Sequence, residues 1–332
     1  METKVYDLGI VKDEELKFAV IVSKYKGKFV YARHKERETW ETPGGHRELN
    51  EDINDTAARE LREETGAVKF TIEPICDYLC DYSVERESAE KSYGRLYYAE
   101  IEDLGELPDL EIAEIALFDD MPEDLTYPEI QPVLFERVLN QVNRAELINT
   151  ISTIVEGQCK NENNTFGYEI WTCHIVSVVK YAKALAKQLG ANEELVEIAA
   201  LLHDYASIKD KGMYEEHHMY GAIEAQKLLQ GLNYPQEKID IIKDCIICHR
   251  GSVKRIQKTK EAICVASADA MAHIDQIPSL LHLAYHNRKM NVQDGSDWVS
   301  RKIERSFNKL CPEAKEIMKE KYESAKVILG GN

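Results

Sequence analysis

Three glutamates, Glu60, Glu63 and Glu64, stand at a spacing that places them on one face of a helix. Residues three and four positions apart are neighbours on a helix surface, so these carboxylates converge on one place. Converging carboxylates repel each other unless cations neutralise them, and hard oxygen ligands of this kind select Mg²⁺ or Mn²⁺. The spacing therefore predicts a divalent cation site.

The residues around these glutamates add a turn and a helix end. Gly44 and Gly45 let the backbone approach closely, so that a carbonyl can add a ligand, and Gly66 stands where a helix cap belongs. A glutamate-rich helix is usually a solvated face with exposed ion pairs, and residues 59–64 alone would favour that interpretation. The glycine turn, Glu51 and Gly66 at fixed distances favour a metal site instead.

The window from Gly45 to Ala67 resembles the signature of the Nudix hydrolases, with Ala67 where a bulkier aliphatic residue is usual. Weaker signals extend the resemblance over roughly residues 5–140, and it implies a Nudix α/β/α sandwich with a mixed sheet. It also implies that Arg59 pairs with Glu51 to brace the loop against the helix. The metal ligands it implies are the Gly45 carbonyl, Glu60, Glu63 and Glu64.

The chemistry that this resemblance implies is attack of water on a phosphorus of a nucleoside diphosphate-linked substrate, which releases a monophosphate. Bound ions would neutralise phosphate oxygens and lower the pKa of the water, with a glutamate as the base. We take Glu63 and Glu64 as the catalytic residues. Glu111 and Glu114, on a loop further along the chain, remain alternatives for the base.

The stretch from Tyr31 to Trp40 and the following Pro43 are similar to the Nudix branch that clears oxidised purine nucleoside triphosphates. This similarity implies an 8-oxo-dGTP-like triphosphate as substrate, cleaved to a monophosphate and pyrophosphate. Trp40 or Tyr31 would then stack on the base. Core packing is the commoner role of a lone aromatic side chain, so both interpretations stay open.

A second set of chemistry-bearing residues lies in the other half of the chain and comprises His174, His203, Asp204, His217, His218, His249 and Asp269. A lone histidine on an amphipathic helix is usually hydrogen-bonded or exposed. His203 and Asp204, however, end the apolar run 198–202, a costly place for a charge unless it is coordinated or paired. Asp269 stands among small, mostly apolar residues, where a hydrogen-bonded core carboxylate is the alternative.

The order of these residues resembles the HD superfamily, in which a helical bundle gathers a histidine, a His-Asp doublet and a distant aspartate onto one metal. The resemblance covers about residues 168–285 and implies an all-α bundle. His218 and His249 stand where two-metal members bind a second ion, and we favour His218 over His217 because a Gly-Ala pair follows it. The ligands implied for the first ion are His174, His203, Asp204 and Asp269.

Two ions about 4 Å apart would bind a bridging hydroxide and clamp a phosphate ester, with Asp204 as the catalytic residue of this half. Mixed imidazole and carboxylate ligands suit Fe, Mn, Zn, Ni or Co, so the sequence does not name the metal. Arg250, Lys211 and Lys209 are candidate phosphate contacts, although surface cations are usually only solvated. No Gly-Tyr-Pro motif follows the doublet, which argues against a cyclic-dinucleotide phosphodiesterase of that class.

The elements that must position these residues differ between the two halves. Strands are predicted over residues 17–23, 28–33, 68–83 and 93–101, and a helix over 52–65. Beyond about residue 130 apolar residues recur at helical spacing, so the second half is predicted to be all-helical. We therefore expect an α+β Nudix-type domain over residues 1–145 and an all-α HD-type domain over residues 146–332.

Composition limits the possible partners. The 332 residues carry a formal net charge of −17, and neither half has a basic excess, so nucleic acid is not an expected partner. No apolar run approaches the roughly 20 residues that a bilayer requires, and no signal-peptide pattern is present. We expect a cytoplasmic protein without membrane contact that binds small nucleotides. The sequence leaves the oligomeric state open.

The leading hypothesis is a bifunctional metal-dependent hydrolase. Its first half would cleave a nucleoside triphosphate, and its second half a phosphate ester or anhydride of a nucleotide. The alternative keeps both folds but makes one domain a nucleotide-sensing module that regulates the other. Complete ligand sets in both halves argue against this alternative, because a sensor need not retain each metal carboxylate.

Overall fold

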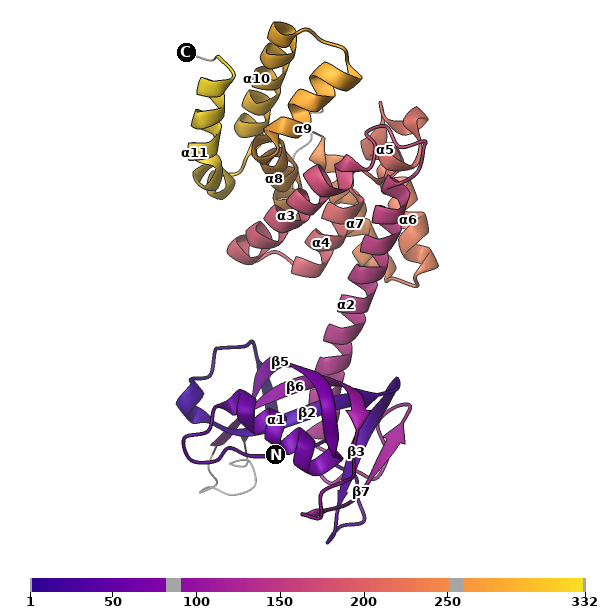
Figure 1. Ribbon diagram of the computed structural model, residues 1–332, viewed down its shortest axis with the longest axis vertical. Helices are drawn as coiled ribbons and strands as arrows, with labels where there is room; N and C mark the ends of the chain where they lie inside the picture. The colour runs from indigo at the N-terminus through magenta and orange to yellow at the C-terminus, as the bar shows by residue number, and fades with distance from the viewer. Residues whose placement is uncertain (1, 82–90, 251–258, 331–332) are drawn as a thin grey trace. The chain divides into compact units, whose positions relative to one another are not determined.

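The computed structural model describes residues 2–81, 91–250 and 259–330 (Figure 1). The chain divides into two compact units, Met1–Ala145 and Glu146–Asn332. The first unit is built on a mixed sheet and the second is helical, which confirms the two predicted fold classes. The last two residues of the strand predicted over 68–83 lie outside the described part of the chain.

The sheet of the first unit has the strand order β1-β5-β6-β2-β3-β7, and β4 pairs with β2. The β2–β6 pair is parallel and the other pairs are antiparallel, so the sheet is mixed. Its strands are β1 (Glu2–Tyr6), β2 (Leu16–Tyr25), β3 (Lys28–His34), β4 (Gly44–His46), β5 (Ala67–Asp81), β6 (Lys91–Leu104) and β7 (Ile112–Phe118).

One helix covers each face of this sheet. Side chains alternate along a strand, so Ile21 of β2 joins the core under α1 (Ile53–Thr65), while Val22 joins the core under α2 (Gln131–Cys159). Both cores are closed by apolar side chains of the covering helix, such as Leu61 of α1 and Phe135 of α2. This arrangement is the predicted α/β/α sandwich.

Local signals set the ends of α1. The Asp52 carboxylate accepts a hydrogen bond from the Asn54 N–H and caps the first turn. Gly66 ends the helix in the left-handed region, at φ 74°, and its N–H donates to the Arg62 carbonyl. A Cβ atom at Gly66 would also lie 2.9 Å from the Glu106 carbonyl oxygen. The helix that carries the glutamates is therefore fixed at both ends.

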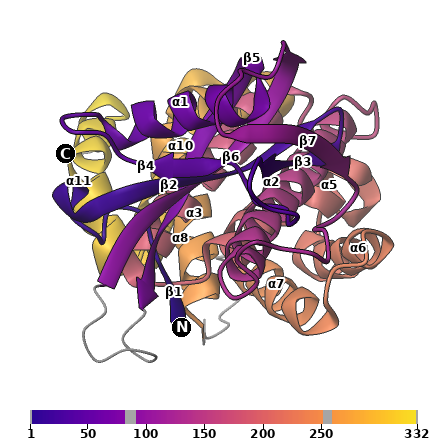
Figure 2. The same ribbon diagram turned by 90° about the horizontal axis from the view of Figure 1, so that it is seen from below.

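The second unit packs its helices around α8, most of whose side chains are buried. The C-terminal part of α2 adds Ile151 and Val155 to the same core. α6 and α7 lie side by side, as Figure 2 shows. The helical segments are η2 (Trp171–Ile175), α3 (Val176–Leu189), α4 (Glu193–Leu202), α5 (Tyr205–Lys209), η3 (Lys211–Met213), α6 (His217–Gly231), α7 (Gln236–His249), α8 (Lys260–Asp275), α9 (Ile277–His282), η4 (Leu283–Asn287), α10 (Val292–Lys309) and α11 (Pro312–Ile328). In the parts of the chain that the structure describes, no helix combines the length and apolar character that a membrane span needs.

Two candidate metal centres

In the first unit, the backbone at Gly45 lies directly against the Glu60 carboxyl group. Gly45 belongs to β4 and Glu60 to α1, and a Cβ atom at Gly45 would lie 2.3 Å from Glu60 Oε1. Only glycine allows this approach without moving the carboxyl group. Beside it, the Gly44 N–H donates to Glu64 Oε2 at 2.8 Å. The glycine turn and α1 thus meet at two of the three predicted glutamates.

Arg59 braces this region from the side. Its Nε and Nη2 atoms donate to the two oxygens of Glu51 at 2.9 and 3.0 Å, the pairing that the resemblance implied. This bidentate pair holds the pKa of Glu51 down at about 2. The Nη1 atom donates to Glu60 at 2.7 Å and to Glu63 at 3.1 Å. The guanidinium therefore stands among the carboxylates that a cation would neutralise.

Glu64 is a half-buried carboxyl group in an acidic environment. Burial, together with the carboxylates of Glu60, Glu41 and Glu111, raises its pKa to about 8 against the hydrogen bond from Gly44. A bound cation would displace the proton and supply the missing positive charge. The oxygen donors present therefore fit Mg²⁺ or Mn²⁺. Sequence reasoning missed Glu41, which is buried and pairs with Arg37 at 2.6 Å.

The three glutamates do not all converge. Oxygens of Glu60, Glu63 and Glu64 do not form a group within 4.8 Å of one another, although all three residues are described. Arg59 holds Glu60 and Glu63, while Glu64 turns to the Gly44 N–H. The Glu63 side chain is 40% exposed. Its role as a ligand or base stays a prediction.

The structure places the other candidate residues of this unit in different environments. Glu111 precedes β7 and raises the pKa of Glu64, whereas Glu114 is held by Arg33 at 2.8 Å, so Glu111 is the better placed alternative base. Tyr31 is a core residue, only 1% exposed, so base stacking is wrong for it. Trp40 is half-buried and packs edge-on against Phe118, as Tyr31 does.

We expect Glu51→Gln to destabilise the first unit by about 2 kcal/mol at pH 7 and to have less effect in acid. The folded-state pKa of Glu51 is about 2, below its ordinary 4.5, so the Arg59 pair contributes stability that is lost as the pH falls from 4.5 towards 2. The difference in free energy of unfolding between wild type and variant should therefore shrink across that range. Urea titrations followed by Trp40 fluorescence, with Trp171 and Trp298 changed to Phe, measure it.

Glu48→Gln is the matched control, because Glu48 is an exposed residue of the same loop. It should change the free energy of unfolding by less than about 0.5 kcal/mol at either pH. A Glu51→Gln effect that stays constant between pH 7 and pH 2.5 would contradict the assignment of this stability to the Arg59 pair.

In the second unit, histidines converge on Asp204 from two sides. Its Oδ2 atom lies 3.5 Å from His203 Nε2 and 3.7 Å from His174 Nε2. Its Oδ1 atom lies 3.6 Å from His217 Nε2 and 3.8 Å from His249 Nε2. Each pair is itself close, with 3.1 Å between the Nε2 atoms of His174 and His203 and 3.2 Å between those of His217 and His249. The Asp204 carboxylate can therefore bridge two ion sites.

Most of these residues lie at or next to the ends of helices, and one lies within the buried helix α8. His203 and Asp204 follow α4, which is buried from Leu195 to Leu202 and so carries the doublet into the interior. His217 opens α6 and His249 closes α7. His174 lies in the π-helical turn η2, and Asp269 projects from α8, with its Oδ1 atom 3.6 Å from His174 Nε2.

The backbone fixes which ring nitrogen faces the cluster. The Nδ1 atoms of His203, His217 and His249 lie 2.7, 2.8 and 2.6 Å from the carbonyl oxygen three residues earlier in the chain. A protonated Nδ1 donates to that carbonyl and leaves the lone pair on Nε2, which points at Asp204. This tautomer is the one that metal-binding imidazoles of this orientation need.

The protonation states also fit a metal. Burial lowers the pKa of His174 to about 4 and that of His249 to about 3, so both are neutral at pH 7. Burial opposes ionisation of Asp204, yet the surrounding histidines, His203 first, hold its pKa below the ordinary value. Neutral imidazoles and ionised carboxylates are ready to bind a cation, and this mixed donor set fits Fe, Mn, Zn, Ni or Co.

His217, and not His218, faces the cluster, so the preference for His218 was wrong. Consecutive residues on a helix point about 100° apart, so only one of the pair can face Asp204. His218 Nε2 lies 3.9 Å from Glu216 Oε2 instead. The glycine that guided the choice serves helix packing, because a Cβ atom at Gly221 would lie 3.1 Å from Ile246 of α7.

Two further residues of the cluster were missed. His273 lies one helical turn after Asp269, with its Nδ1 atom 3.7 Å from Asp269 Oδ1, and its ring stacks on His174 at a centroid distance of 5.1 Å. Together His174, Asp269 and His273 form a third group that could hold an ion. The spacing of four residues was an available signal. Lys309 of α10 donates to Asp269 Oδ2 at 3.0 Å and offsets burial of that carboxylate.

We expect His217→Ala to remove about one ion per chain from the second unit, while His218→Ala retains it. The reason is that only the His217 imidazole faces Asp204 and His249. Metal analysis of the purified variants by mass spectrometry measures the content, and hydrolysis should fall at least about 10-fold in His217→Ala alone. The reverse pattern, with the ion lost in His218→Ala, would refute this assignment.

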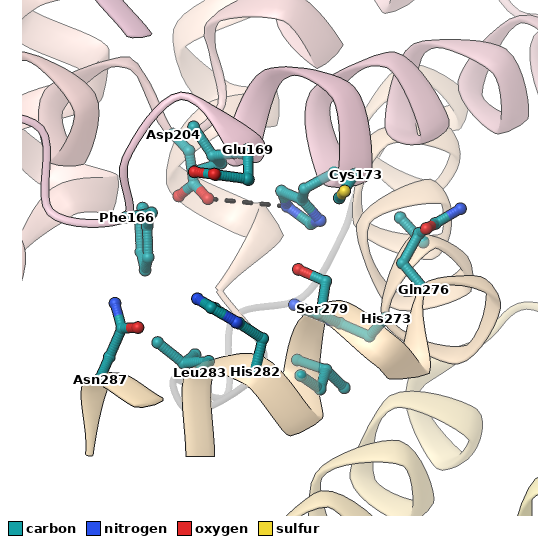
Figure 3. A pocket seen from close by; sticks show the side chains of 14 residues that line it. Phe166, Glu169, Cys173, Asp204, His273, Gln276, Ser279, His282, Leu283 and Asn287 are labelled. Carbon is teal, nitrogen blue, oxygen red and sulfur yellow. Dashed lines mark ion pairs between the residues drawn. The ribbon is translucent and has the colours of Figure 1, made fainter. Parts of the chain in front are cut away.

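Two cavities open at the cluster, and both are lined by Asp204 and His273. The smaller one, of about 100 Å³, also has neutral polar side chains in its wall, among them Gln276, Ser279 and Asn287 (Figure 3). The larger one, of about 570 Å³, is lined by the cluster and by side chains of α10. The candidate metal site is therefore reachable from two sides.

Of the predicted phosphate contacts, only Arg250 lines the larger cavity. Lys209 pairs with Glu224, and Lys211 donates to the Glu162 carbonyl at 3.1 Å. Neither lysine lines either cavity. The two lysines are therefore engaged elsewhere.

Comparison with known protein families matches a different model to each unit. Residues 14–133 match the NUDIX domain and residues 172–273 match the HD domain. These matches confirm both resemblances inferred from the sequence.

Curated relatives match parts of the chain. A Bacillus subtilis protein named "Putative 8-oxo-dGTP diphosphatase YtkD" is 32% identical over 107 residues, which are 32% of this chain and 64% of that protein. Ribonuclease Y of Fusobacterium nucleatum is 25% identical over 201 residues, which are 58% of this chain and 34% of that protein. The chain thus spans about a third of that ribonuclease. Among solved structures, the Lin1889 protein of Listeria innocua is 20% identical, with a TM-score of 0.42 over 56% of this chain and 93% of that one.

Proposed function

We propose that this chain, which contains a NUDIX domain over residues 14–133 and an HD domain over residues 172–273, is a bifunctional metal-dependent nucleotide hydrolase. Hydrolysis of phosphoryl compounds is common to both families. The observation that carries the proposal is the Asp204 carboxylate, whose two oxygens face separate histidine pairs. We take the units 1–145 and 146–332 as the two functional domains.

In the HD half, one ion would be held by His174, His203, Asp204 and Asp269, and a second by Asp204, His217 and His249. Bound ions supply positive charge to phosphate oxygens and lower the pKa of water. The chain's own contribution is orientation, because backbone carbonyls fix the imidazoles and Lys309 holds Asp269. The reaction we propose is hydrolysis of a phosphate ester or anhydride of a nucleotide.

In the Nudix half, Mg²⁺ or Mn²⁺ would be held by the Gly45 carbonyl, Glu60, Glu63 and Glu64. Glu63 or Glu64 would take the proton from the attacking water, with Glu111 as the alternative. We propose a nucleoside triphosphate as substrate, such as an 8-oxo-dGTP-like one, cleaved to a monophosphate and pyrophosphate. The name of the Bacillus relative supports this choice.

Small nucleotides are the partners that the charge supports best. The net charge of −17 disfavours a polyanionic polymer, whereas one nucleotide neutralised by bound cations suits acidic sites. We therefore propose no nucleic-acid or membrane partner and a cytoplasmic location. The relatives named ribonuclease Y make a short RNA a necessary member of any substrate panel.

The test uses the full chain, because α2 (Gln131–Cys159) runs through the boundary between the two units and a cut there would break it. Wild type, Glu64→Gln and Asp204→Asn are assayed on nucleoside triphosphates, monophosphates, dinucleoside polyphosphates and a short RNA, with Mg²⁺, Mn²⁺ or Fe²⁺. The proposal expects each variant to lose a different activity. Tight binding without turnover in one half would favour the sensing alternative, and no turnover by wild type would remove the proposal.

A further inference from the structure

Positive charge is gathered on one side of the HD cluster. The larger cavity is lined by five cationic side chains, namely Arg250, Arg288, Lys302, Arg305 and Lys309. The smaller cavity, which opens at the same cluster, has no lysine or arginine among its lining residues. Of the cations, all but Arg250 lie beyond residue 273, where the match to the HD model ends. Arg288 lies in the turn between η4 and α10, and the other three belong to α10.

Three of these cations have no carboxylate partner. Lys309 pairs with Asp269 and Arg250 lies 4.0 Å from Glu216, but Arg288, Lys302 and Arg305 make no ion pair within the described ranges of the chain. Arg288 instead lies over the Trp298 ring, 4.6 Å from its centroid. Cations gathered in one cavity without direct ion pairs repel each other, and a bound anion relieves that repulsion.

The carboxylates in this cavity do not cancel the charge once ions are bound. Asp204 and Asp269 line it, but both are proposed ion ligands, so their charge is neutralised by the metal. Glu215 is the third lining carboxylate. With ions in place, the cations that line this cavity therefore give it a positive charge beside the cluster where a phosphoryl group would be hydrolysed.

We propose that this cavity binds the phosphoryl groups next to the one that is hydrolysed, so that the HD half acts on two or more linked phosphates. This inference rests on the proposed function. Of the two bonds proposed there for hydrolysis by the HD half, a phosphate ester or a phosphate anhydride, it selects the anhydride. A volume of about 570 Å³ is that of a small-molecule site, since such sites span roughly 300–1,000 Å³, and it leaves room beyond a single phosphate. Both a nucleoside polyphosphate and an inorganic polyphosphate contain such linked phosphoryl groups.

The test measures binding of imidodiphosphate, whose bridging nitrogen resists hydrolysis, to Mn²⁺-loaded full chain by calorimetry. All samples carry Glu64→Gln to weaken the Nudix site. The cavity variant is Arg288→Gln with Arg305→Gln, and the matched control is Arg301→Gln, an exposed arginine of α10 that does not line the cavity. Inorganic phosphate is the reference ligand, because it occupies only one phosphoryl position.

The cavity variant should weaken imidodiphosphate binding at least about 10-fold and inorganic phosphate binding by less than about 3-fold, while Arg301→Gln changes neither by more than about 2-fold. The single Arg305→Gln variant, an exposed substitution, should show part of the same loss. Equal weakening of both anions, or no weakening, would overturn the inference. If adenylyl imidodiphosphate binds at least about 10-fold tighter than imidodiphosphate, the ligand is a nucleoside polyphosphate. If the two bind equally tightly, the ligand is an inorganic polyphosphate.

Failure of this inference can be distinguished from failure of the proposed function. Hydrolysis that disappears in Asp204→Asn measures the HD activity. If the anion binds as expected but no activity depends on Asp204, the proposed function fails while the binding site stands. If that activity on triphosphates is present and the cavity variant leaves it unchanged, the function stands and the inference is overturned.

Discussion

Asp204→Asn is expected to reduce hydrolysis by the HD half on the order of 10³-fold and to lower the ion content of the chain. Both carboxylate oxygens face imidazoles, Oδ2 towards His174 and His203 and Oδ1 towards His217 and His249. Asparagine keeps the shape but has one oxygen and no charge, so it cannot bridge two cations. Activity assays and metal analysis of the same sample measure both effects.

Asp210→Asn is the control for this prediction. Asp210 is an exposed aspartate that caps the following turn through the Gly212 N–H, and it lines neither cavity. Its change should alter HD activity by less than about 2-fold and leave the ion content intact. If the Asp204→Asn variant keeps its ions and its activity, Asp204 is not the ligand that joins the two ion sites.

Glu64→Gln is expected to reduce hydrolysis by the Nudix half about 10²–10³-fold while leaving the HD activity unchanged. Glu64 lies half-buried beside the glycine turn, and its side chain accepts a hydrogen bond from the Gly44 N–H, a contact that glutamine can retain. The variant therefore loses the negative charge needed to hold a cation or accept a proton, with little change of shape. Initial rates on nucleoside triphosphates at saturating Mg²⁺ measure the loss.

Glu41→Gln is the matched control, since Glu41 is a buried carboxylate near Glu64 but pairs with Arg37. It should cost less than about 10-fold. Glu63→Gln is informative beside it, because the structure does not gather Glu63 with both Glu60 and Glu64. Full activity in both Glu63→Gln and Glu64→Gln would contradict the assignment of this site and shift attention to Glu111.

The parts of the two sites that the sequence predicted rest on local signals. The helix of Glu60 and Glu64 could be located because its residues favour a helix and Gly66 caps its end, and the i, i+4 spacing then fixes the common face. The doublet at residues 203 and 204 stood out because charge follows a run of buried apolar positions. Neither feature depends on distant parts of the chain.

The parts that were missed depend on tertiary packing. Whether His217 or His218 faces the cluster depends on where α6 begins and on how α6 is rotated against α7. Neither property can be read from the residues next to the two histidines. Lys309 and Arg305 reach the HD cluster and its larger cavity only because α10 packs against α8. Similarly, the three glutamates are kept from gathering by the contacts of Arg59 and Gly44, which helical spacing does not show.

The central claim is that Asp204 joins two ion sites, and anomalous diffraction from crystals of the full chain grown with Mn²⁺ tests it most directly. We predict two anomalous peaks flanking the Asp204 carboxylate, one beside His174 and His203 and the other beside His217 and His249. A map that shows no manganese within bonding distance of Asp204, at full Mn²⁺ occupancy elsewhere in the crystal, would contradict the account.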